Sequence, residues 1–276
     1  MVKLKKGGRQ LECILSILNI SITTSLQKQR RLLSLPVEPK FLTLSGTGIK
    51  LSMDLKELGV VIPAYNAERT IGLILEELIK FGFDKKKIIV VDDGSKDRTA
   101  QVAREFGVDV LKNERNIGKG GSLNRGFQWA IAKGLKKVFT LDADGQHQVS
   151  DIDRFLKIDD DYDLIIGDRL KSSPDMPFIR FIVNRITSLV ISLLGRRYIP
   201  DVQSGYRLIN LGIFKKIRLK TKNFQTESEL VYKAIKYNFR IGFVPVTTLY
   251  NSERSYIMPL IDTIRFINMA VRFLWV

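Results

Sequence analysis

Cysteine and histidine are almost absent from this chain of 276 residues, with Cys13 and His147 as their only representatives. A single cysteine excludes an internal disulfide framework and a zinc site built from several cysteines. A single histidine argues against a histidine-dependent catalytic triad and against a multi-histidine metal site. The remaining candidates for chemistry are carboxylates, arginines and a bound divalent cation.

Long hydrophobic runs and negative charge are also scarce. The apolar stretch at residues 11–26 is interrupted by Glu12 and Asn19, and it falls short of the roughly 20 mostly apolar residues that a membrane-spanning helix needs. The chain has 45 Lys and Arg against 29 Asp and Glu, a formal net charge of +16. This excess predicts an anionic partner, which leaves nucleic acid, a phosphorylated small molecule and an acidic membrane surface open.

Three regions differ in composition. Residues 1–57 form a basic and apolar extension in which no motif carries chemistry. From residue 58 onward, short β-branched runs alternate with stretches of helical spacing. We expect strands at 58–62 (ended by Pro63), 87–91, 108–111 and 137–141, and helices near 71–79, 97–106 and 121–133. This alternation predicts an α/β fold with a mostly parallel central sheet and helices on both faces.

Polar clusters follow three of the predicted strands, at residues 63–68, 92–97 and 142–147. In open parallel sheets the ligand site lies beyond the carboxyl ends of the strands, so the three clusters are expected to share one crevice. Asp142 and Asp144 stand there at positions i and i+2, and both can turn toward one point. Such a pair favours Mg²⁺ or Mn²⁺, and Gln146 is a candidate third ligand.

Two further segments are candidates for ligand contacts. Residues 90–99 place Asp92 and Asp93 at a strand end, where a carboxylate can accept a hydrogen bond from a nucleobase; a receiver-type phosphoacceptor domain is a rival interpretation. Residues 116–122 open a helix with glycines that allow the backbone to approach a phosphate. Lys119 in that segment is either a direct ligand or a solvated side chain. The spacing matches neither the Walker A nor the dinucleotide-binding motif.

Two amphipathic helices are predicted after residue 167. In residues 178–194 the side chains of Arg180, Asn184, Arg185, Ser188 and Ser192 fall on one arc, and apolar residues fill most of the rest. Residues 258–276 show a similar pattern with a narrower polar stripe. Wide apolar faces beside basic polar faces are typical of helices in a membrane interface, although packing on the protein body is an alternative. The final Phe-Leu-Trp-Val favours lipid contact.

Taken together, the motifs are more specific than any one of them. In chain order they are Val61-Ile62-Pro63-Ala64-Tyr65-Asn66-Ala67-Glu68, Val91-Asp92-Asp93-Gly94-Ser95, Asn116-x-Gly118-Lys119-Gly120, Asp142-Ala143-Asp144-Gly145-Gln146-His147, Gly167-Asp168-Arg169, Asp201-Val202-Gln203-Ser204-Gly205-Tyr206-Arg207 and Phe224-Gln225-Thr226-Glu227. From about residue 58 to the C-terminus, the chain closely resembles family 2 glycosyltransferases of the GT-A fold. Within that family it resembles the polyprenyl-phosphate and dolichyl-phosphate mannosyl- or glucosyltransferases.

The resemblance implies a GT-A catalytic domain at residues 58–252, an interfacial helix at about 176–195 within it, and a C-terminal membrane-interface helix at 253–276. It also implies three catalytic residues: Asp142, Asp144 and Arg169. The implied nucleotide-sugar contacts are Pro63, Tyr65, Glu68, Val91, Asp93, Asp142, Ala143, Arg169, Arg207 and Arg254. The implied acceptor-phosphate contacts are Arg180, Arg185 and Ser188, and the implied metal ligands are Asp142, Asp144 and Gln146. The family pattern usually has a second acid at the position of Ala67. Glu227 either positions Arg207 or the sugar, or forms a buried ion pair.

The implied activity is metal-dependent inverting transfer of glucose or mannose from a nucleotide-diphosphate sugar to a polyprenyl phosphate, with Mg²⁺ or Mn²⁺ as cofactor. Such a reaction belongs to glycan or cell-envelope biosynthesis. We expect a peripheral protein on the cytoplasmic face of an anionic membrane, since no segment is long enough to span it. Two alternatives stay open: a soluble family 2 enzyme that glycosylates a hydroxyl group, with Glu227 or Asp201 as base, and a basic nucleic-acid-binding protein.

Overall fold

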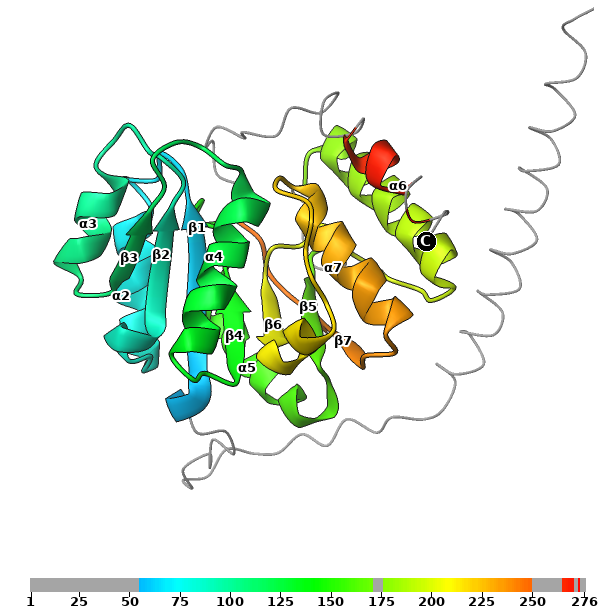
Figure 1. Ribbon diagram of the computed structural model, residues 1–276, viewed down its shortest axis with the longest axis horizontal. Helices are drawn as coiled ribbons and strands as arrows, with labels where there is room; N and C mark the ends of the chain where they lie inside the picture. Colours follow the sequence, from blue (N-terminus) through cyan, green and yellow to red (C-terminus); the bar gives the residue numbers. More distant parts are fainter. Residues whose placement is uncertain (1–54, 171–175, 250–264, 271–272, 274–276) are drawn as a thin grey trace, which may run out of the picture. The chain divides into compact units, whose positions relative to one another are not determined.

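The computed structural model describes residues 55–170, 176–249, 265–270 and 273 (Figure 1). The centre is a seven-stranded sheet in the order β3-β2-β1-β4-β6-β5-β7. The strands are β1 (Leu58–Ala64), β2 (Ile88–Asp92), β3 (Asp109–Lys112), β4 (Lys137–Thr140), β5 (Leu164–Asp168), β6 (Arg207–Asn210) and β7 (Ile241–Pro245). The α-helices are α2 (Ile71–Phe81), α3 (Thr99–Glu105), α4 (Lys119–Ala132), α5 (Ile152–Leu156), α6 (Phe178–Gly195) and α7 (Gln225–Lys236).

The prediction of a mostly parallel sheet is confirmed. Strand β1 pairs in parallel with β2 and β4, β2 with β3, and β5 with β7. Among the strands of the described residues, only β6 runs antiparallel, between β4 and β5. The carboxyl ends of β1, β2, β3 and β4 therefore meet at one edge of the sheet, and the predicted crevice lies beyond it.

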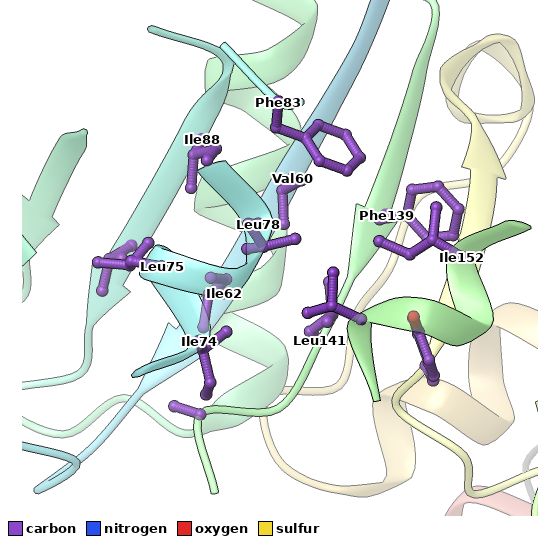
Figure 2. Packing of buried hydrophobic residues seen from close by; sticks show 14 of the residues in the cluster. Val60, Ile62, Ile74, Leu75, Leu78, Phe83, Ile88, Phe139, Leu141 and Ile152 are labelled. Atoms are coloured by element: carbon purple, nitrogen blue, oxygen red, sulfur yellow. The ribbon is translucent and has the colours of Figure 1, made fainter. Parts of the chain in front are cut away.

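Helices cover both faces of the sheet, so strand β1 is buried throughout. One core cluster joins β1 and β4 to α2 and α5, and it includes Ile62, Leu75 and Phe139 (Figure 2). A second cluster on the other face packs Val61 of β1 against α4 and α7, which lie on the near side of the sheet in Figure 1. Because β1 is apolar on both faces, its sequence is a continuous hydrophobic run, as expected for a parallel sheet.

The prediction that Pro63 ends the first strand is wrong. Strand β1 continues to Ala64, and Pro63 pairs in register with Val91 of β2. On its other side, β1 pairs with β4 only as far as Val61. Proline lacks a backbone N–H and is tolerated in a strand where one side has no ladder partner. The strand passes beyond the end of β4 at this point, so no ladder hydrogen bond to β4 is lost.

Helix α6 buries several polar side chains and exposes several large apolar ones, although Ile191 of the same helix is in the core. The side chains of Asn184, Thr187 and Ser188 are buried. Its exposed large hydrophobic residues recur at helical spacing and are Ile182, Ile186, Leu189 and Leu193. Residues 265–270 are also helical, and Ile267 is exposed there. None of the helices in the described part of the chain combines the length and hydrophobicity that crossing a bilayer requires.

Candidate active site

Three loops at the carboxyl edge of the sheet interlock through hydrogen bonds between main-chain groups and side-chain hydroxyls. The Asn66 N–H after β1 donates to Ser95 Oγ after β2, at 2.9 Å. The Thr70 hydroxyl donates to the Ala143 carbonyl after β4, at 2.5 Å. The three polar clusters are thus brought together at one edge of the sheet, as their positions after the strands predict.

The predicted nucleoside contacts lie at the ends of β1 and β2 and in the two loops that follow these strands. Pro63 and Val91 are neighbours in the β1–β2 register, and Tyr65 follows β1 in a partly buried position. The Glu68 carboxylate accepts a hydrogen bond from the Arg98 N–H at 3.0 Å. A nucleoside role for these residues stays a prediction.

Asp93 is engaged with the loop that precedes α4. Its Oδ1 accepts hydrogen bonds from Asn113 Nδ2 at 2.7 Å and from the Ile117 N–H at 2.9 Å, and its Oδ2 accepts one from the Gly118 N–H at 2.9 Å. The residue is buried. In this geometry Asp93 fixes the start of α4, so its direct contact with a nucleoside also stays a prediction.

Lys119, the first residue of α4, lies between two acidic side chains. Its Nζ is 2.6 Å from Asp142 Oδ1 and 2.7 Å from Glu227 Oε1. Burial by itself lowers the pKa of a lysine, but the two carboxylates outweigh it and raise the pKa of Lys119 above its usual value. Burial likewise opposes ionisation of Asp142, yet the Lys119 ammonium holds the pKa of that carboxyl below its usual range. Lys119 and Asp142 are therefore both charged at neutral pH.

The loop after β4 is shaped around Asp142. The Asp142 N–H donates to Nδ1 of His147 at 3.3 Å, and the His147 ring stacks on Tyr206 with centroids 4.8 Å apart. Burial lowers the pKa of His147, which favours the neutral ring that can accept this bond. Gly205, in the segment before β6, approaches closely, because a Cβ there would lie 2.5 Å from Asp142 Oδ1.

The residues of this loop fit a weakly held divalent cation. The Asp144 Oδ1 accepts a hydrogen bond from the Gln146 N–H at 3.0 Å. This bond closes the turn that follows Asp142 and fixes Asp144 and Gln146 within it. Within the described residues, no three side chains of His, Cys, Asp or Glu converge as a complete metal cage. Two carboxylates and one amide suit Mg²⁺ or Mn²⁺, which retain water and take further oxygens from a phosphate. The Lys119 ammonium shows that Asp142 accepts a cation.

Arg169 is held by a buried bidentate ion pair. Its Nε and Nη2 donate to Asp201 at 2.7 and 2.9 Å, and both side chains are almost fully buried. Burial raises the pKa of a carboxyl, but Arg169 overrides it and lowers the pKa of Asp201. Val202, which follows Asp201 in the chain, donates its N–H to the hydroxyl of Ser188 on α6 at 3.0 Å. Ser188 thus anchors the loop that carries the partner of Arg169.

Arg207 lies beneath the crevice at the start of β6. Its guanidinium donates to the main-chain carbonyls of Val202, Ser204 and Glu227 at 2.7–3.0 Å. Burial lowers the pKa of Arg207 to about 10, which still leaves it charged at neutral pH. The arginine joins β6 to the start of α7, and its contact with a nucleotide sugar stays a prediction.

The other predicted basic contacts lie on α6 or beyond the described residues. Arg185 is exposed, and its guanidinium lies 5.5 Å from the centre of the Phe181 ring. Arg180 is partly buried one turn earlier. Arg254 lies outside the described residues. The acceptor roles of Arg180, Arg185 and Ser188 stay predictions.

Two residues have larger structural roles than the sequence pattern indicates. Lys119 is enclosed by two carboxylates rather than solvated. The sequence feature that indicated a role for this lysine is its position between the two glycines at the start of α4. Gly118 and Gly120 allow this turn to pack directly on Asn223 and Thr226, where a Cβ would collide. His147, the last residue of the motif that begins at Asp142, accepts a hydrogen bond from the Asp142 N–H, a contact that the motif does not reveal.

Comparison with known proteins agrees with this geometry. The family model described as glycosyl transferase family 2 matches residues 59–218, which is more than half of the chain. UDP-N-acetylglucosamine–dolichyl-phosphate N-acetylglucosaminyltransferase of Methanococcus voltae is 33% identical over 219 residues, covering 71% of this chain and 86% of that protein. Polyprenol monophosphomannose synthase of Mycolicibacterium smegmatis is 29% identical over 201 residues, covering 68% and 76%.

A solved structure supports the fold. Glucosyl-3-phosphoglycerate synthase from Mycobacterium tuberculosis, crystallised with Mn²⁺, uridine diphosphate and phosphoglyceric acid, superposes with a TM-score of 0.62 at 18% identity, covering 84% of each chain. Another crystal of that enzyme contains Mg²⁺ and uridine diphosphate. The α/β architecture with its mostly parallel sheet is therefore that of the GT-A fold. The chain belongs to glycosyltransferase family 2, and it is a glycosyltransferase.

Proposed function

We propose that this enzyme transfers a hexose from a nucleotide-diphosphate sugar to a polyprenyl phosphate of the dolichyl type at a membrane surface, with inversion at the anomeric carbon. The relatives from Methanococcus voltae and Mycolicibacterium smegmatis carry names that specify dolichyl phosphate and polyprenol monophosphate. The observation that carries the proposal is the exposed apolar face of α6, which belongs to a helix tied to the Asp142 crevice.

The tie between α6 and the crevice runs through residues 199–205. Gln203 donates from Nε2 to the Thr187 hydroxyl on α6 at 3.2 Å, and Gly205 in the same segment packs against Asp142. A lipid contact on α6 therefore lies on the element that also supports the reacting groups. An acceptor whose chain remains in the bilayer needs such an arrangement, since its phosphate is presented at the membrane surface.

Asp142, Asp144 and Gln146 would hold Mg²⁺ or Mn²⁺ in this proposal. The ion, when bound, supplies positive charge that stabilises the leaving diphosphate. Arg169, fixed by Asp201, contributes a second positive charge at the same edge of the sheet. Pro63 near the end of β1 and Tyr65 in the loop that follows it would bind the nucleoside.

The acceptor chemistry explains why no free general base is needed. A sugar hydroxyl has to lose a proton during attack, whereas a phosphate monoester is ionised at neutral pH. The two carboxylates considered as bases, Glu227 and Asp201, are both committed to buried ion pairs. This disfavours the alternative of a hydroxyl acceptor. Arg185 on α6 would bind the acceptor phosphate, because a guanidinium matches phosphate oxygens in geometry and charge.

The membrane association follows from the same helix. The exposed apolar stripe of α6 contributes hydrophobic burial, and the net charge of +16 adds attraction to anionic lipids. We therefore propose a peripheral protein on the cytoplasmic leaflet, where nucleotide sugars are made.

The test is transfer of radiolabelled sugar into extractable lipid. The enzyme is incubated with polyprenyl phosphate, Mg²⁺ or Mn²⁺, and in turn UDP-glucose, GDP-mannose and UDP-N-acetylglucosamine. Label is expected in the organic phase with one of these donors. Asp144→Ala is expected to abolish transfer, because the cation loses one of two carboxylates, whereas Asp160→Ala, a change at a highly exposed acid, leaves it intact. Transfer only to a water-soluble hydroxyl acceptor, or undiminished turnover of Asp144→Ala, would refute the proposal.

A further inference from the structure

The Lys119 ammonium occupies a place that a metal ion also requires. It touches Asp142 Oδ1 at 2.6 Å, and this is one of the two carboxylates assigned to the cation. The lysine side chain is only 15% exposed, so solvent offers it little alternative to its protein partners. A divalent ion that binds Asp142 therefore has to compete with a positive charge that is already there.

Glu227, the second carboxylate beside Lys119, can bind the Lys119 ammonium without Asp142. Its side chain is 4% exposed and lies in the first turn of α7. Apart from the Lys119 ammonium, no donor in the described part of the chain provides a hydrogen bond to either of its carboxylate oxygens. Glu227 is thus able to keep the ammonium after Asp142 has been released.

The backbone around Lys119 keeps the lysine beside both carboxylates. The Gly121 N–H donates to the Lys222 carbonyl at 3.0 Å, which fastens the start of α4 to the segment before α7. The Lys119 ammonium also lies 5.9 Å from the centre of the Phe224 ring. A small movement of the side chain suffices to change partners, because its backbone does not have to move.

We propose that Lys119 is a resident counter-cation that neutralises Asp142 before the metal arrives, and that Glu227 retains the displaced ammonium when the divalent ion binds. The pair thereby sets the metal affinity of the site. This inference rests on the proposed metal-dependent function, and it assigns a positioning role to two residues that are not themselves metal ligands.

The inference predicts opposite effects at the two residues. Lys119→Met removes the competing charge, so Mn²⁺ is expected to bind at least about tenfold more tightly. Glu227→Gln leaves the ammonium with Asp142 as its sole anionic partner, so Mn²⁺ is expected to bind at least about threefold more weakly. The double variant has the same net charge as the original protein. If the double variant binds Mn²⁺ more tightly, the gain comes from removal of the Lys119 ammonium and not from a change in the net charge of the protein.

The experiment is direct titration of the purified full chain with MnCl₂, followed by isothermal calorimetry and by the electron paramagnetic resonance signal of free Mn²⁺. Lys137→Met is the matched control, because Lys137 is a similarly covered lysine, 20% exposed, that lies 2.6 Å from Asp159 away from the crevice. Its affinity for Mn²⁺ is expected to equal that of the unaltered protein. Thermal unfolding of every variant reports whether it is folded.

The outcomes separate this inference from the proposed function. Tighter binding by Lys119→Met and by the double variant, at least about threefold for the latter, supports the exchange of partners. Unchanged or weaker binding by the folded double variant overturns it, even if the single lysine variant does not fold. Absence of Mn²⁺ binding by the unaltered protein, with or without added uridine diphosphate, overturns the metal-dependent function itself.

Discussion

Replacement of two exposed apolar residues on α6 is expected to release the protein from membranes. Ile186 and Leu193 are 55% and 53% exposed, and they lie on the same stripe as Ile182 and Leu189 at 39% and 41%. Full burial of such a side chain is worth about 2–3 kcal/mol, so each half-exposed residue contributes about 1 kcal/mol on entering lipid.

The four residues together then supply about 4 kcal/mol, which corresponds to roughly a thousandfold in the partition coefficient. Ile186→Ser combined with Leu193→Ser removes about half of this free energy. The predicted loss is about 2 kcal/mol, or roughly thirtyfold in vesicle binding. The free energy of unfolding in solution is expected to change little, because neither side chain is in the core.

The measurement is flotation or sedimentation with vesicles that contain anionic lipid, at several lipid concentrations. The matched control is Leu73→Ser with Ile131→Ser, which removes two apolar side chains of similar exposure, 62% and 49%, from α2 and α4. Control binding is expected to equal that of the unaltered protein. Equal loss in both double variants, or no loss in the α6 variant, would refute the assignment of α6 as the lipid-facing helix.

Three further changes test the site. Arg185→Ala is expected to raise the KM for polyprenyl phosphate roughly tenfold while the KM for the nucleotide sugar changes little, and equal increases in steady-state assays would contradict its role at the acceptor. Asp201→Asn removes the carboxylate that holds the buried Arg169, so urea unfolding should show a loss of about 3–5 kcal/mol, whereas a loss below 1 kcal/mol would refute the buried pair. The pKa of His147 in the folded protein lies below its unfolded value of 6.5, because burial disfavours the charged ring. Below pH 6.5 the unfolded state therefore binds more protons than the folded state. The free energy of unfolding is highest above pH 6.5 and falls as the pH drops below that value. His147→Asn, which retains an acceptor for the Asp142 N–H, should flatten the fall in unfolding free energy between pH 6.5 and 5, and an unaltered slope would exclude His147 as its source.

The sheet was largely predictable from the sequence because its signals are local. The run that forms β1 is apolar on both faces, and the helix over residues 71–79 shows its spacing directly, so the structure reproduces both. The end of β1 was not predictable, since a proline in a strand is tolerated only where the neighbouring strand has ended. The extent of β4 decides this, and β4 is distant in the sequence.

The position of the candidate site residues at one edge of the sheet was predictable, but the contacts that they make were not. Asp142 and Asp144 follow a strand in the sequence, and the comparisons support the family to which that pattern belongs. The partners of Asp93, which are amides of the loop before α4, cannot be read from the spacing. Hydrogen bonds between loops depend on the distance between strand ends, and no local pattern encodes that distance.

By itself, the sequence determined the parallel α/β framework, the family, and the acidic pair at the end of β4, because hydrophobic periodicity and short motifs are properties of neighbouring residues. Only the tertiary structure decided that Lys119 joins Asp142 to Glu227, that Asp201 holds Arg169, and that α6 turns its apolar side outward. The reason is physical: the choice of ion-pair partner, and of the helix face that meets solvent, is made by packing between segments that are far apart in the chain.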